Sequence, residues 1–142
     1  MIYWFTGQPG SGKTTLAAFI KEITPKCIHI DGDDIRNLYD NKDYSKQGRM
    51  KNIELAQNMA YFLYKKGFTV VVSLVSPYRE QREEFKKLVG RDLIEIYVHT
   101  NELRGREQFH VADYQPPLDS FIDIDTTNDT IEHSVVEILT NK

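Results

Sequence analysis

The residues that most clearly suit a chemical function, by type and by spacing, form a glycine-rich run near the amino terminus. The run is Gly7-Gln8-Pro9-Gly10-Ser11-Gly12-Lys13-Thr14, a full match to the pattern G-x-x-x-x-G-K-[ST]. Glycines reach backbone angles that are closed to other residues, so successive N–H groups can converge on phosphate oxygens. A helix that begins near Lys13 adds the N–H groups of its first turn. The pattern predicts a P-loop that binds a nucleoside triphosphate.

Two side chains of this run have distinct predicted roles. We expect Lys13 to face solvent and to reach the β- and γ-phosphates, and the Thr14 hydroxyl to ligate Mg²⁺. ATP and Mg²⁺ are the expected cofactors, with contacts from the whole run and from Thr15. The alternative is a chance glycine-rich turn. Against it, an apolar strand leads directly into the run and an amphipathic helix leads out of it.

A second polar cluster, Asp31-Gly32-Asp33-Asp34-Ile35-Arg36, follows the second apolar run of the chain. In an open parallel sheet, ligands bind beyond the carboxyl ends of the strands. Carboxylates there would face the P-loop and contact a substrate hydroxyl or the Mg²⁺ shell. Acidic residues also stabilise the N-terminus of a helix through its dipole. Both interpretations can hold together.

Five short apolar runs predict the strands that position these clusters. They are Ile2–Phe5, Cys27–Ile30, Phe68–Val72, Leu93–Val98 and Phe121–Ile124. Near-continuous apolar character over this length is typical of strands covered on both faces, as in a parallel sheet. Cys27 is the only cysteine, so an internal disulfide is excluded and we expect the thiol to pack in the core.

Helical spacing occupies the stretches between the strands. An amphipathic helix is predicted over Thr14–Ile23, and the longest helix over roughly residues 46 to 66, with Gly67 just past its end. A charged helix is expected from near Pro77 to Gly90. A last helix carries Ile131, Val135, Ile138 and Leu139, with Asn128 or Asp129 as its N-cap.

Strands that alternate with helices predict an α/β fold. We expect a three-layer sandwich with a five-stranded, mostly parallel sheet, the P-loop NTPase fold. The 142 residues suit a single domain over residues 1–142. The net charge of −3 and a pI near 5.8 argue against broad binding of duplex nucleic acid. No apolar run is long enough to span a bilayer and no signal-peptide pattern is present, so a cytoplasmic protein is expected.

The order of these motifs resembles the adenylylsulfate kinases, which phosphorylate the 3′-hydroxyl of adenosine 5′-phosphosulfate. That family carries a P-loop, an Asp-Gly-Asp-Asn-x-Arg segment, a Gly-Phe-Ser-x-x-Asp-Arg-x-x-Asn-Ile stretch, a Ser-Pro-(Phe/Tyr)-Arg turn and a lid aromatic. The matching positions here are Asp33, Arg36, Tyr44-Ser45, Arg49-x-x-Asn52-Ile53, Ser76-Pro77-Tyr78-Arg79 with Arg82, Phe109, and Thr126-Thr127 after the last strand. The resemblance covers residues 1 to about 100 and the final 25 or so.

The resemblance implies roles for the matching residues. Asp33 would orient the accepting hydroxyl. Arg36, Arg49 and Asn52 would hold the sulfate–phosphate end, since guanidinium groups suit such oxyanions. An aromatic pair would sandwich the adenine, and the turn serine would join the substrate site; these residues are Tyr44, Phe109 and Ser76. The alternatives are a polar helix face for Arg49 and Asn52, and simple packing for Phe109.

The chain departs from the family pattern at three places. Gly48 replaces an acidic residue, Asp34 replaces an asparagine, and the lid, about residues 100–117, is much shorter than in the family. We expect Arg104 and Arg106 of this lid to bring charge to the transferring phosphate and to act in catalysis with Lys13 and Asp33.

The leading hypothesis is an ATP-dependent kinase with a nucleotide-like hydroxyl acceptor, a phosphotransferase of the adenylylsulfate kinase type. One alternative is a kinase for another hydroxyl acceptor, either a small metabolite or a polynucleotide, because a short lid opens the site to bulkier molecules. The other is a non-catalytic nucleotide-binding module that acts as a switch. Joint presence of Lys13, Thr14, Asp33 and Arg36 argues against the module. A homodimer is compatible with the sequence.

Overall fold

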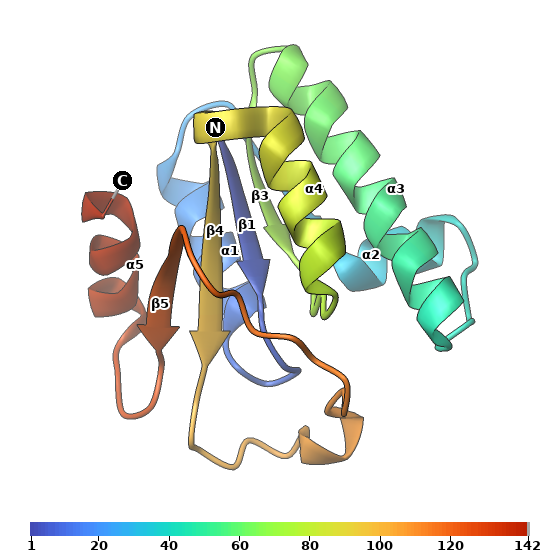
Figure 1. The fold of residues 1–142 in the computed structure, drawn as a ribbon. Coiled ribbons are helices and arrows are strands. Elements are labelled where there is room, and N and C mark those ends of the chain that lie inside the picture. The colour runs from blue at the N-terminus through green and yellow to red at the C-terminus, as the bar shows by residue number, and fades with distance from the viewer. Residues whose placement is uncertain (142) are drawn as a thin grey trace.

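The computed structural model describes residues 1–141 and contains one five-stranded sheet between layers of helices (Figure 1). The strands are β1 (Ile2–Thr6), β2 (Cys27–Asp31), β3 (Thr69–Ser73), β4 (Leu93–His99) and β5 (Phe121–Asp125). Their spatial order is β2-β3-β1-β4-β5 and every neighbouring pair is parallel. The predicted fold class is confirmed, with a sheet that is fully rather than mostly parallel.

Each strand ends one residue later than its apolar run. The extra residues are all polar, namely Thr6, Asp31, Ser73, His99 and Asp125. Because the strands are parallel, these five polar residues gather at one edge of the sheet. The apolar runs stop where the candidate site begins, which is why hydrophobicity alone placed every strand end one residue short.

The helices are α1 (Lys13–Ile23), α2 (Gly32–Leu38), α3 (Lys46–Lys65), α4 (Arg79–Val89) and α5 (Ile131–Thr140), with short 3₁₀ turns at Gly90–Asp92 (η1) and Glu107–Phe109 (η2). The predicted N-cap of α5 is wrong. Thr130 caps this helix, and its hydroxyl accepts a hydrogen bond from the backbone N–H of His133 at 3.1 Å. A capping oxygen reaches the third helical amide only from the residue directly before the helix, which excludes Asn128 and Asp129.

Two hydrophobic clusters hold the layers together. On one face, α1 and α5 pack against the sheet through Leu16, Ile20, Val135 and Ile138, and Cys27 is buried with them as expected. On the other face, α3 and α4 cover β1 and β3 (Figure 1). On that second face, the lid runs back across β4 in Figure 1, and Tyr114 stacks on Tyr97 of β4 with 5.9 Å between ring centroids.

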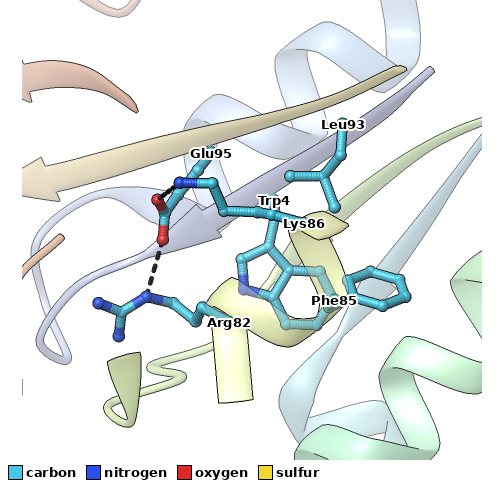
Figure 2. A pocket seen from close by; sticks show the side chains of 6 residues that line it. All are labelled: Trp4, Arg82, Phe85, Lys86, Leu93 and Glu95. Atoms are coloured by element: carbon cyan, nitrogen blue, oxygen red, sulfur yellow. Dashed lines mark hydrogen bonds and ion pairs between the residues drawn. The ribbon is translucent and has the colours of Figure 1, made fainter. Parts of the chain in front are cut away.

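A buried ion pair on that second face joins α4 to β4. The carboxylate of Glu95 is fully buried and accepts from Arg82 Nε and Lys86 Nζ, each at 2.8 Å, beside Trp4 and Phe85 (Figure 2). A buried charge requires such pairing to offset lost hydration. Arg82 also donates to the carbonyls of Ser76 and of Gln115 in the lid, so this pair anchors the turn after β3 and the lid to the sheet. Within residues 1–141, the longest apolar stretches of helix fall short of a membrane span.

Candidate active site

The P-loop connects β1 to α1 and has the backbone form that phosphate binding requires. Gly7, Gly10 and Gly12 all have positive φ angles. A side chain at Gly7 would place its Cβ only 2.2 Å from the Val98 carbonyl oxygen, so this position demands glycine. No side chain caps the first turn of α1. The amides of that turn therefore remain available to an anionic ligand.

Lys13 lies inside the curve of the P-loop and not in solvent, which corrects the expected exposure. The residue is 7% exposed, and its ammonium donates to the Gln8 carbonyl at 2.9 Å. Burial lowers the pKa of Lys13 to about 8, while the nearby Asp31 and Asp33 carboxylates partly oppose this shift and Arg106 adds to it. The loop backbone surrounds the amine, because a loop shaped to bind a phosphate also encloses the lysine that would contact this phosphate. The lysine is thus positioned before a ligand arrives.

Two carboxylates lie near this loop, Asp31 at the end of β2 and Asp33 in the first turn of α2. Asp31 accepts hydrogen bonds from the Thr14 hydroxyl at 3.1 Å and from the Ser73 hydroxyl at 2.8 Å. Asp33 is exposed in the first turn of α2, close enough to Lys13 to influence its pKa. Gly32 between them has no room for a side chain, since a Cβ would lie 2.9 Å from that of Leu74.

The oxygen groups of Thr14 and Asp31 suit Mg²⁺. This ion prefers oxygen ligands and is commonly held by one or two protein groups together with substrate phosphates. Thr14 gives its proton to Asp31, so the lone pairs of its oxygen stay available. Residues 1–141 contain no cluster of three or more His, Cys, Asp or Glu side chains that could hold a metal ion.

Arg36 and Tyr44, two predicted acceptor residues, contact each other. The Arg36 guanidinium lies 4.0 Å from the centre of the Tyr44 ring and donates to the carbonyls of Asn41 and Asp43. Tyr44 is 64% exposed. Loop 40–45 also explains the absence of an acidic side chain at Gly48, because a Cβ there would lie 2.2 Å from the Asp43 carbonyl oxygen.

Arg49 and Asn52, also predicted for the acceptor, lie one turn apart on α3. Arg49 forms an ion pair of 3.7 Å with Asp113 of the lid. Asn52 is 5% exposed and donates to the Gly32 carbonyl at 3.3 Å, next to the Asp33 segment. Its Oδ1 has no hydrogen-bond partner among the described residues. A buried amide oxygen without a partner indicates a place where a ligand or water donates.

The two predicted lid arginines both lie beside the P-loop, next to Gly10. Arg104 donates to the carbonyls of Gly10, Ser11 and Thr126, between the P-loop and the turn after β5. Arg106 stacks on Phe109 at 5.3 Å and is the lid arginine that lowers the pKa of Lys13. Phe109 is 57% exposed, so it is not a core packing residue. A cavity of about 290 Å³ lies between the lid, the P-loop and the end of β4.

Ser76 is the predicted substrate residue that lies deepest. It is 1% exposed, has a φ of 47°, and its hydroxyl accepts from Trp4 Nε1 at 3.2 Å. Its contact with substrate stays a prediction.

Sequence reasoning missed several groups that hold the site. Gln8 was predicted only as part of the nucleotide-binding run, but its side chain also exchanges two 2.8 Å hydrogen bonds with the backbone of Val111 and thereby joins the P-loop to the lid. Ser73 and His29 extend the hydrogen bonds of Asp31 into the sheet. Glu95 was detectable as a charged residue within an apolar run, because a buried carboxylate needs cationic partners. Ser73 and His29 left no such signal.

Comparison with known proteins identifies the family. Residues 1–111 match the model of the family described as Adenylylsulphate kinase. This chain belongs to the adenylylsulphate kinase family. The Adenylyl-sulfate kinase of Staphylococcus epidermidis is 33% identical over 162 residues, covering 97% of this chain and 81% of that protein. The enzyme of Picosynechococcus is 42% identical over 101 residues, covering 68% of this chain and 56% of that protein.

The family assignment agrees with the fold. A structure of the Mycobacterium tuberculosis APS kinase CysC in complex with AMPPNP and APS superposes with a TM-score of 0.82, covering 98% of this chain and 95% of that one, at 23% identity. The Staphylococcus alignment is longer than this chain, so that adenylyl-sulfate kinase carries residues without a counterpart here. The chain is an ATP-using phosphotransferase of P-loop kinase fold.

Proposed function

We propose that this kinase transfers the γ-phosphate of MgATP to the 3′-hydroxyl of adenosine 5′-phosphosulfate. The observation that carries the proposal is the placement of Lys13 and Asp33 on facing elements at one edge of the sheet, close enough for the Asp33 charge to influence the pKa of Lys13. The family to which the chain belongs supports the identity of the acceptor.

Catalysis in this proposal is positioning and electrostatic stabilisation. The P-loop amides and Lys13 hold the β- and γ-phosphates, and Arg106 approaches from the lid. Bound Mg²⁺ supplies positive charge that neutralises the phosphate oxygens, and Thr14 with Asp31 would hold it. Asp33 aligns the acceptor hydroxyl with the γ-phosphorus and accepts its proton.

The acceptor site is assembled from α2, α3 and the lid. Arg36 and Arg49 provide the charge for the phosphosulfate, Asn52 donates or accepts through its amide, and Tyr44 and Phe109 stack on the adenine. Both arginines hold other groups of the chain in the free protein. Binding of the acceptor therefore replaces the Arg49–Asp113 ion pair and the loop carbonyls on Arg36 with bonds to substrate oxygens.

A different hydroxyl acceptor is the second candidate. The short lid leaves Tyr44, Phe109 and Leu103 exposed, with 87% of Leu103 accessible, and a larger molecule could enter over these residues. A polynucleotide end or a small metabolite fits this opening chemically. This candidate keeps the same P-loop and the same Asp33.

One acceptor screen tests both candidates. The protein is incubated with γ-labelled ATP, Mg²⁺ and either adenosine 5′-phosphosulfate, nucleosides, small polyols or oligonucleotides, and labelled products are separated. We expect transfer to adenosine 5′-phosphosulfate at the highest kcat/KM. Transfer to oligonucleotides or polyols alone would favour the second candidate, and nucleotide binding without any transfer would indicate a binding module. A homodimer and a cytoplasmic location stay predictions.

A further inference from the structure

A chain of hydrogen bonds runs from the middle of β2, an edge strand of the sheet, to the P-loop. His29 Nε2 lies 2.7 Å from the Ser73 hydroxyl oxygen, and this oxygen lies 2.8 Å from Asp31 Oδ1. The same Oδ1 lies 3.1 Å from the Thr14 hydroxyl oxygen. Asp31 and Ser73 are directly paired in the register of β2 and β3, so the backbone of the sheet sets the geometry of this chain.

The direction of each hydrogen bond follows from the chemistry of the groups. A carboxylate only accepts, so Ser73 and Thr14 both donate to Asp31. Ser73 has a single proton and gives it to Asp31, hence it accepts from His29. His29 must therefore carry a proton on Nε2. The Thr14 proton is directed at Asp31, and the lone pairs of the Thr14 oxygen point away from that carboxylate.

We propose that His29 and Ser73 are positioning residues that fix the Asp31 carboxylate, so that Asp31 holds the Thr14 proton and presents the Thr14 oxygen to the Mg²⁺ of the bound nucleotide. This inference rests on the MgATP part of the proposed function and is independent of the acceptor. Groups that orient metal ligands without touching the metal contribute about 10- to 100-fold to metal affinity in other proteins. Ser73 contacts Asp31 directly, so its contribution exceeds that of His29.

A purely structural role makes a different prediction. If these hydrogen bonds only joined β2 to β3, their loss would weaken the fold. Nucleotide binding would then fall equally with and without Mg²⁺. A positioning role reduces only the part of nucleotide affinity that Mg²⁺ adds. The two roles are therefore separated by measuring ADP binding in Mg²⁺ and in EDTA.

The experiment compares four single variants by titration calorimetry. Ser73→Ala removes the donor to Asp31, and His29→Leu removes the donor to Ser73. His29→Gln keeps an amide donor near the position of Nε2 and should rescue. Thr69→Ala is the matched control, because it deletes a hydroxyl from the same face of β3 at the far end of the strand. Thermal unfolding of each variant checks that it is folded.

We expect ADP affinity in EDTA to stay within about twofold of the wild type in all four variants. The gain in affinity on adding Mg²⁺ should fall about tenfold in Ser73→Ala and severalfold in His29→Leu. His29→Gln and Thr69→Ala should keep the wild-type gain. The double variant of Ser73→Ala and His29→Leu should lose no more than Ser73→Ala alone, because both act through one hydrogen bond to Asp31.

Three results would overturn the inference. If Mg²⁺ still raised ADP affinity by the wild-type factor in Ser73→Ala and His29→Leu, the hydrogen bonds from His29 and Ser73 would not act on the metal. Equal losses in EDTA and in Mg²⁺ would assign it a structural role. If the ADP affinity of the wild-type protein did not depend on Mg²⁺, the inference would have no metal site to act on. Failure of phosphoryl transfer to adenosine 5′-phosphosulfate, by contrast, would overturn only the proposed acceptor, since these titrations contain none.

Discussion

The nucleotide half and the acceptor half of this site differ in how complete they are without a ligand. In the nucleotide half, Lys13 is buried in its loop and the Thr14 hydroxyl already has its partner. In the acceptor half, Tyr44 and Phe109 are largely exposed, and Arg36 and Arg49 are bound to other parts of the chain. In the proposed function, the phosphate side therefore has its groups in place beforehand, whereas the acceptor side would exchange contacts on binding.

Physical chemistry gives a reason for this difference. Preorganised dipoles around a reacting phosphate lower the activation barrier because they need no reorganisation during the reaction. An exposed ion pair such as Arg49–Asp113 contributes at most about 1 kcal/mol, so a charged substrate can replace it at little cost. In the proposed function, groups that already have partners lie at the transferring phosphate, and exchangeable contacts lie where the acceptor would enter.

The largest effect is expected in the preorganised half. Lys13→Ala should lower kcat/KM for phosphoryl transfer by about 10³–10⁵-fold, the value of a cation at the transferring phosphoryl group. The midpoint of thermal unfolding should not fall, because the substitution removes a charge whose burial lowers its pKa. Initial rates with labelled ATP and a melting curve measure both quantities. Unchanged turnover would contradict the role assigned to the P-loop.

Asp33 lies where the two halves meet. Asp33→Asn should lower kcat by about 10²–10⁴-fold and leave ATP affinity within a fewfold, because the carboxylate acts on the acceptor hydroxyl. Asp34→Asn is the matched control, as it removes the neighbouring exposed carboxylate of the same helical turn. A collapse of ATP affinity in Asp33→Asn would instead assign Asp33 to the Mg²⁺ shell.

In the acceptor half, Arg49→Ala should affect the two substrates differently. Loss of one charge-assisted contact to the acceptor should lower kcat/KM for adenosine 5′-phosphosulfate about ten- to a hundredfold. ATP hydrolysis in water should be nearly unchanged, and Lys51→Ala, an exposed cation on the same helix, should change neither rate. Equal damage to both reactions would move Arg49 to the ATP phosphates.

Asp113→Ala should improve acceptor binding, the opposite of the effect expected for Arg49→Ala. The substitution frees Arg49 from its ion pair in the lid, so KM for the acceptor should fall by up to about fivefold while kcat stays near the wild-type value. Steady-state kinetics at saturating MgATP measure this change. A rise in KM would mean that Asp113 itself supports the acceptor and that the exchange of partners does not occur.

The smallest expected effect is the uptake of protons when ADP binds. With a pKa of about 8, Lys13 is half neutral at pH 8 in the free protein, and nucleotide phosphates should restore its charge. ADP binding at pH 8 should take up about half a proton, falling toward zero near pH 6. Calorimetry in two buffers of different ionisation enthalpy measures the uptake, and Lys13→Arg should abolish it.

Lys13 also affects how the stability of the fold depends on pH. Between about pH 8 and 10.5 the unfolded chain binds more protons at this lysine than the folded chain does, so the free energy of unfolding should rise with pH there.

The strands, the P-loop and the order of the motifs were predictable because they depend on residues close together in sequence. Apolar runs specify buried strands, and the glycine pattern specifies a phosphate loop. The chemical types of Asp33, Arg36 and Asn52 were also readable, but their partners were not. Asn52 was visible as a polar residue on a helix, whereas its unpaired and buried Oδ1 depends on how α3 packs beside Gly32.

The sequence alone predicted a nucleotide-binding loop at Gly7–Thr14 and showed that acidic and basic groups follow the strands. Only the tertiary structure decided which groups meet. Contacts such as His29 with Ser73, Arg82 with Glu95 and Arg104 with the P-loop carbonyls join residues from separate elements. Side-chain type and spacing cannot specify such pairs, because strand register and the path of the lid set the distances between them.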